Sequence, residues 1–108
     1  MPKTLTPEEI KALKNKLFRS AESMQKQHEF KLGQLVRWKE GLQNRKRPAY
    51  GEPVIVWEIL AKPLYDDKEG AGSTYYREPL DIVLGLMTED DEFIVFHFDK
   101  RRFEPFPE

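Results

Sequence analysis

The chain has 108 residues, of which 39% are hydrophobic and 34% charged, and its net charge is −1. A chain of this length is most economically one domain, and this composition is typical of a globular protein. It has no cysteine, which excludes disulfides, thiolate metal sites and a cysteine nucleophile.

The small net charge conceals a division along the chain. Residues 1–60 carry 12 Lys or Arg against 7 Asp or Glu, whereas residues 61–108 carry 6 against 12. The two parts therefore have charges of +5 and −6. Such a division indicates either a charged partner or attraction between the two halves within the fold, and both interpretations stay open.

The segment LTPEEIKAL predicts a helix that begins after Thr6. Thr6 is the candidate N-cap, Pro7 stands at the first helical position, and Glu9 completes a capping box. The helix should continue to about residue 28. An apolar stripe at helical spacing contains Ile10, Leu13, Leu17, Ala21 and Met24.

The apolar stripe determines what residues 1–29 pack against. We expect residues 1–29 to form a helix packed on a domain of residues 30–108. The same stripe can instead pack on a second copy of the chain. The oligomeric state is therefore open between a monomer and a homodimer through the N-terminal helix.

From Phe30 the apolar period changes to two, which predicts strands. Gly85 indicates a bulge or a close approach within its strand, and Pro105 indicates that the last strand is at an edge. The expected strands are FKLGQLVRWK (30–39), PVIVWEIL (53–60), LDIVLGLM (80–87), EFIVFHF (92–98) and RFEPF (102–106).

Two long connections and two short ones join these strands. EGLQNRKRPAYGEP forms the first loop, and residues 61–79 form either a protruding hairpin or a partly mobile flap. TEDD predicts a tight turn, and DKRR predicts a single helical turn before the last strand.

This succession of elements resembles the five-stranded SH3-like barrel, a group of folds that includes SH3, Tudor and KOW-type modules. The resemblance covers residues 30–106, where FKLGQLVRWK is similar to the entry strand of such barrels. It implies a mainly β fold: an N-terminal amphipathic α-helix followed by a five-stranded SH3-like barrel. The first loop here is basic, unlike the acidic, tyrosine-rich loop of peptide-binding SH3 domains, so the resemblance implies no particular ligand. The chain also looks similar to short bacterial proteins.

Few residues are candidates for catalysis or metal binding. His28 falls on the helix stripe, and His97 should face away from Phe96 and Phe98. Acidic residues cluster at 66–69 and 89–92 without EF-hand spacing, which indicates solvated turns. No phosphate-binding loop, nucleophile elbow or zinc-protease motif is present. We therefore expect no enzymatic activity, no metal and no cofactor.

Cations interleaved with aromatic residues raise the possibility of nucleic-acid binding, by phosphate neutralisation and base stacking. A solvated loop explains the same residues, and the isoelectric point of about 6.2 is low for a nucleic-acid-binding domain. The cations of this alternative are Arg37, Lys39, Arg45, Lys46 and Arg47.

The leading hypothesis is a non-enzymatic module that binds a protein partner through its two long loops, because exposed tyrosines favour interfaces. No apolar run is long enough to cross a bilayer and the N-terminus lacks the apolar core of a signal peptide, so we expect a cytoplasmic protein without a membrane partner. The predicted partner-binding residues are Arg45, Lys46, Arg47, Tyr50, Tyr65, Tyr75 and Tyr76.

Overall fold

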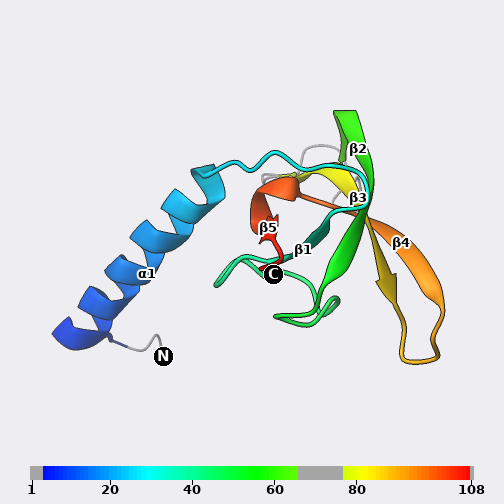
Figure 1. The fold of residues 1–108 in the computed structure, drawn as a ribbon. Coiled ribbons are helices and arrows are strands. Elements are labelled where there is room, and N and C mark those ends of the chain that lie inside the picture. The colour runs from blue at the N-terminus through cyan, green and yellow to red at the C-terminus, as the bar shows by residue number, and fades with distance from the viewer. Residues whose placement is uncertain (1–3, 66–76, 108) are drawn as a thin grey trace.

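The computed structural model describes residues 4–65 and 77–107 and consists of one α-helix, five strands and one 3₁₀ turn (Figure 1). The predicted mainly β fold with an N-terminal helix and five strands is confirmed. The elements are α1 (Pro7–Gln25), β1 (Leu35–Trp38), β2 (Val54–Tyr65), β3 (Pro79–Met87), β4 (Phe93–Phe98), η1 (Lys100–Arg102) and β5 (Phe103–Pro105).

The start of α1 follows the predicted capping box. The Thr6 hydroxyl accepts a hydrogen bond from the backbone N–H of Glu9, and the Glu9 carboxylate accepts one from the backbone N–H of Thr6. The helix ends at Gln25, three residues before the predicted end, because Lys26 leaves the helical region with a ψ of 113°. His28 therefore lies beyond the helix and is not part of its stripe, which corrects the prediction.

The strands form one antiparallel sheet in the order β4-β3-β2-β1-β5, with β2 in the centre. Among the described strands, β4 pairs only with β3 and β5 pairs only with β1, so the expected closed barrel is wrong. β5 has three residues, and Pro105 lacks an N–H, so this edge has little capacity to accept another strand. Pro105 lies at an edge, as predicted.

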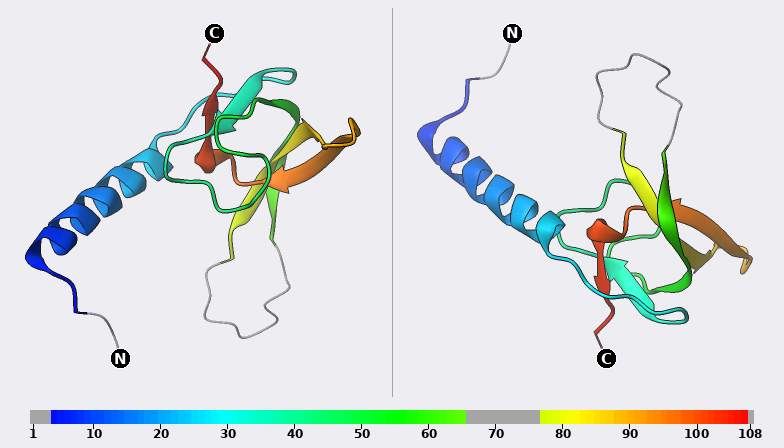
Figure 2. Two further views of the ribbon diagram at one scale, coloured as in Figure 1. Left: turned by 90° about the horizontal axis from the view of Figure 1, so that it is seen from below. Right: turned by 90° about the horizontal axis from the view of Figure 1, so that it is seen from above.

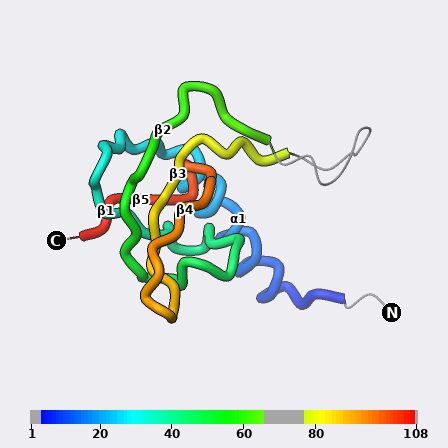
Figure 3. The backbone as a smooth tube through the Cα atoms, turned by 90° about the vertical axis from the view of Figure 1, so that its right-hand side faces the viewer, coloured from blue at the N-terminus to red at the C-terminus, as the bar shows by residue number. Residues whose placement is uncertain are grey.

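The sheet curves around a single hydrophobic core, and Figure 3 shows the bend of β2 and β3. Every strand contributes at least one core residue, so the open sheet still buries one face. The core residues are Val36, Trp38, Val54, Val56, Ile82, Leu84, Leu86, Phe98 and Phe103.

The first strand is shorter than predicted. The backbone turns at Gly33, whose φ is +84°, and the N–H of Gln34 bonds to the carbonyl of Lys31. A glycine adopts this φ without the steric penalty of a side chain. Regular pairing therefore begins at Leu35, while Phe30 precedes the strand and packs against the core from the side.

The second and third strands extend into the segment that we predicted as a loop of residues 61–79. Leu64 pairs with Leu80 and Tyr65 pairs with Pro79, so the described ends of the segment are the arms of a hairpin. Residues 66–76 lie outside the described ranges. The hairpin interpretation is confirmed for the arms alone.

The helix projects away from the sheet and meets it near its own C-terminal end, next to η1 (Figures 1 and 2). No residue of α1 is buried, so the apolar stripe is exposed rather than packed along the domain. The radius of gyration is 16.3 Å. A compact domain of this length has about 13 Å.

Gly85 allows the ring of Phe93 to lie against the backbone of β3. A Cβ at position 85 would come within 2.3 Å of the Phe93 ring. We expect Gly85→Ala to lower the free energy of unfolding by about 1–3 kcal/mol through overpacking, measured by urea denaturation. Removing the ring in Phe93→Ala should make the same glycine substitution nearly neutral, and equal penalties in both backgrounds would contradict this packing.

Candidate interaction site

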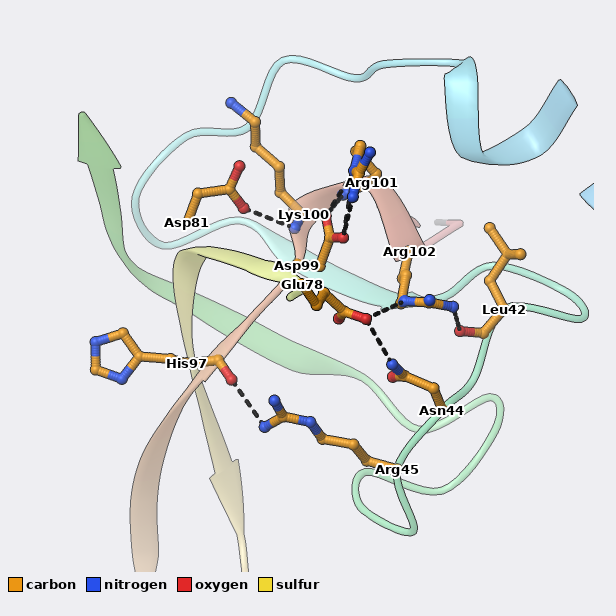
Figure 4. Close-up of polar contacts among 10 residues, drawn as sticks. All are labelled: Leu42, Asn44, Arg45, Glu78, Asp81, His97, Asp99, Lys100, Arg101 and Arg102. Carbon is orange, nitrogen blue, oxygen red and sulfur yellow. Dashed lines mark hydrogen bonds and ion pairs between the residues drawn. The ribbon is translucent and has the colours of Figure 1, made fainter. Parts of the chain in front are cut away.

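Two side chains from outside the first loop, residues 39–53, donate hydrogen bonds to backbone carbonyls of the loop and hold it against the sheet. The indole N–H of Trp38 donates to the carbonyl of Pro48 at 2.6 Å, and the Arg102 guanidinium donates to the carbonyl of Leu42 at 3.0 Å. Trp38 is itself a core residue, and Arg102 ends η1 directly before the core residue Phe103. The loop backbone is therefore tied to the sheet at two points, of which Figure 4 shows the bond from Arg102 to Leu42.

Side chains of the loop add further contacts, shown in Figure 4. The Glu78 carboxylate accepts hydrogen bonds from the Asn44 amide and the Arg102 guanidinium at 2.9 and 3.2 Å. Arg45 donates to the carbonyl of His97 at 3.0 Å, and its guanidinium lies 5.2 Å from the centre of the Phe98 ring. Arg45, predicted as a partner-binding residue, thus contacts its own sheet.

The cations of the predicted nucleic-acid surface lie at separate places. The Arg37 guanidinium forms an ion pair with Glu104 at 2.9 Å, and Arg47 lies 3.8 Å from Glu89. Lys39 is buried, whereas Lys46 is exposed. The structure therefore does not gather the predicted set on one surface.

Lys39 joins the loop to the helix. Its ammonium donates to the carbonyls of Ser23 and Lys26 at 2.5 and 2.6 Å, so it binds carbonyls at the end of α1. Burial lowers the pKa of the Lys39 ammonium, and the Glu104 carboxylate opposes that shift. Lys39, which the nucleic-acid alternative names as a ligand contact, thus holds the end of the helix in the structure.

The helix and the first loop enclose a groove of about 640 Å³ that the sequence did not reveal. Cations, hydroxyls and one tyrosine line it, and Arg37 with Glu104 closes one wall. We call this the junction groove. Its lining residues are Lys16, Arg19, Ser20, Ser23, Arg37, Glu40, Gly41, Tyr50 and Glu104.

The polar side of α1 is the side that borders the junction groove. Lys16, Ser20 and Ser23 line the groove. At 100° per residue, the mean direction of these side chains lies about 90° around the helix from that of the stripe, with Ser20 and Leu13 adjacent at the boundary. The helix therefore presents polar groups to its own domain and apolar groups to solvent.

The convex face of the sheet, opposite the core, carries a second exposed apolar surface. The Trp57 and Phe93 ring centres are 5.6 Å apart, with 58% and 49% of these residues exposed. We call this surface the outer patch. Its residues are Leu35, Ile55, Trp57, Phe93 and Val95.

The predicted tyrosines do not form one surface in the described part of the chain. Tyr50 is exposed and lines the junction groove. Tyr65 ends β2 and lies 5.6 Å from the Arg77 guanidinium. Tyr75 and Tyr76 lie outside the described ranges. The remaining predicted residues, Lys46 and Arg47, line a separate pocket of about 210 Å³ beside the end of β3.

The two histidines lie on different elements. His28 lies between α1 and β1 with its ring 6.1 Å from that of Phe30. His97 pairs with Val83, on the face opposite the core residue Phe98, as predicted. Within residues 4–65 and 77–107, no group of three or more His, Asp or Glu residues is arranged to hold a metal ion.

Comparison of the chain with protein-family models, curated proteins and solved structures gives no match. In the part of the chain that the structure describes, no helix combines the length and apolar character needed to cross a membrane.

Replacing Lys39 should loosen the end of α1 without disturbing the sheet. In Lys39→Met, we expect amide exchange at residues 22–26 to accelerate at least about tenfold, because loss of a charged hydrogen bond costs roughly 1.5–3 kcal/mol. Amides of β3 should keep their protection. Lys46→Met, at an exposed lysine of the same loop, is the matched control, and equal exchange in both variants would refute the role of Lys39.

His28 should make the fold less stable in acid. Burial, and then the positive charges of Lys39 and Lys26, lower its pKa below the ordinary value of 6.5. As the pH falls through 6.5, the unfolded chain binds a proton that the folded chain binds less readily, so stability decreases. We expect His28→Asn to lose less unfolding free energy than the wild type between pH 8 and pH 5, as measured in urea. Parallel pH profiles would exclude this contribution.

Proposed function

We propose that the chain is a non-enzymatic module that binds a protein partner, and that the junction groove receives an acidic, extended segment of that partner. The observation that carries this proposal is the groove between α1 and the first loop, with cations and hydroxyls along one wall. A groove of this volume is large enough for several side chains.

The lining supports an acidic ligand. Lys16 and Arg19 extend from one wall, while Arg37 is already paired with Glu104. Two exposed cations thus remain to meet carboxylates, and the hydroxyls of Ser20 and Ser23 can donate hydrogen bonds. Charge complementarity of this kind accelerates encounter and selects partners.

Tyr50 gives the groove an aromatic residue suited to an interface. Tyr50 is 57% exposed and belongs to the first loop, which bonds from Trp38 and Arg102 hold in place. An aromatic side chain on a fixed backbone contributes contact area at low entropic cost. We therefore still propose that the first loop contacts the partner, now through Tyr50, while Arg45 holds the loop against β4.

We keep the resemblance to SH3-like domains as part of this proposal. A long loop after β1, a tight turn before β4 and a single 3₁₀ turn before β5 support it. The sheet differs from a closed barrel in that its edge strands, β4 and β5, do not pair with each other.

A second candidate is single-stranded nucleic acid in the same groove. The placement of Lys16, Arg19 and Arg37 around Tyr50 favours it, because phosphates and a base could be bound together. Because Glu104 engages Arg37, two cations remain in the wall, which favours a protein segment with a few carboxylates over a strand that carries a phosphate at every nucleotide.

A peptide-display selection on the intact chain tests the proposal. We expect the enriched peptides to be acidic. Arg19→Glu or Tyr50→Ala should weaken their affinity for the chain at least about tenfold, a loss of ~1.4 kcal/mol of binding free energy. Lys46→Glu, outside the groove, is the matched control and should bind like the wild type.

The same variants distinguish the two ligand classes. A labelled mixed-sequence single strand should bind weakly or not at all. If the single strand binds tightly and in a salt-sensitive way, and Arg19→Glu abolishes this binding, then nucleic acid rather than a protein is the ligand of the groove. If the selected peptides bind the Arg19→Glu and Tyr50→Ala variants as tightly as the wild type, the groove is not the binding site.

A further inference from the structure

We propose that the chain forms a symmetric dimer in which the apolar stripe of α1 from each copy packs on the outer patch of the other. This inference does not depend on the proposed function, because the stripe and the outer patch lie outside the junction groove.

The stripe of α1 is an unpartnered apolar surface. Leu17 is 59% exposed, and Ile10 and Leu13 are also exposed. A helix with a polar face and an apolar face is stabilised mainly by burial of the apolar one. Here the polar side borders its own domain, so the apolar side is directed outward to a partner.

The outer patch offers a matching surface. Gly85 has no side chain, and the Phe93 ring lies over it, beside Trp57. Leu35 and Val95 extend the apolar area along β1 and β4. An exposed aromatic surface of this kind can accept the ridge of an apolar helix.

The helix cannot cover the outer patch of its own chain. Lys39 holds the end of α1 through the carbonyls of Ser23 and Lys26, next to η1. Figure 1 shows α1 leaving on the β1–β5 side of the sheet, away from β4, which carries Phe93. Because the two exposed apolar faces of one chain cannot contact each other, a second copy can bury both of them.

Charge favours the same arrangement. Outside the junction groove, α1 carries Lys11 and Lys14, whereas the outer patch is bordered by the acidic turn of residues 89–92 immediately before Phe93. In a dimer the basic helix of one copy lies near the acidic turn of the other. The opposite charges of the two halves of the chain then attract between copies.

The exposed surface is large enough for such an interface. The chain exposes 8550 Å². A compact monomer of this mass exposes about 6300 Å². The excess over the whole chain is roughly 2000 Å², against the ~800 Å² that each partner buries in a standard interface.

Symmetry makes the contact testable, because a two-fold dimer contains two equivalent helix–sheet contacts. Analytical ultracentrifugation should show a wild-type dimer. Leu17→Asp on the helix and Trp57→Asp on the sheet should each weaken it at least tenfold. Leu64→Asp, at a residue that is 52% exposed but outside both surfaces, is the matched control and should remain dimeric.

Mixing the two defective variants distinguishes this contact from others. A chain with Leu17→Asp keeps its patch and a chain with Trp57→Asp keeps its helix, so the mixture should recover one contact and form a heterodimer. Helix–helix pairing would instead leave Trp57→Asp fully dimeric, and sheet–sheet pairing would leave Leu17→Asp dimeric. Either result, or a wild type that stays monomeric at high concentration, would overturn the proposal.

Cross-linking supplies a test that does not depend on disruption. The chain has no cysteine, so Leu13→Cys and Val95→Cys each place a single thiol on one of the two surfaces. Mild oxidation of the mixture should give a disulfide between the two variants in preference to either homodisulfide. Predominant Leu13→Cys homodisulfide, or no disulfide at all, would contradict helix–sheet packing.

Discussion

The packing of Trp38 is the interaction on which the rest of the structure depends. Its indole is fully buried, stacks 4.3 Å from the Phe103 ring and meets the Phe98 ring edge-on at 5.8 Å. Its N–H donates to the carbonyl of Pro48 in the first loop. One side chain thus joins β1, β4, β5 and the loop, because an indole combines a large apolar surface with a single polar donor.

The second constraint is the cost of burying cations, which the fold meets by pairing them with backbone carbonyls. The buried Lys39 binds the end of α1, the half-buried Arg102 binds the loop, and Arg45, although exposed, binds a carbonyl of β4. A buried donor must find an acceptor, and helix ends and loops supply carbonyls that no strand satisfies. The basic first strand and loop therefore organise the junction groove, and the cations that face it from the other side belong to α1.

The open sheet and the projecting helix have a common consequence: apolar surface that one copy cannot bury. The core takes one face of the sheet, while Trp57 and Phe93 remain on the other. The helix directs Leu17 away from its own domain. The proposed dimer and the proposed acidic ligand use different sides of α1, so one helix can serve both without competition.

Local patterns in the sequence were sufficient for the helix start, the alternation of Val36 and Trp38, the close approach at Gly85 and the edge position of Pro105, because each depends on neighbouring residues or on intrinsic backbone geometry. They were insufficient for the open edge between β4 and β5, for the helix end set by Lys39, and for the groove that brings Lys16 of the helix near Tyr50 of the loop. These features join residues far apart in the chain, and only the packing of the curved sheet decides which distant side chains meet.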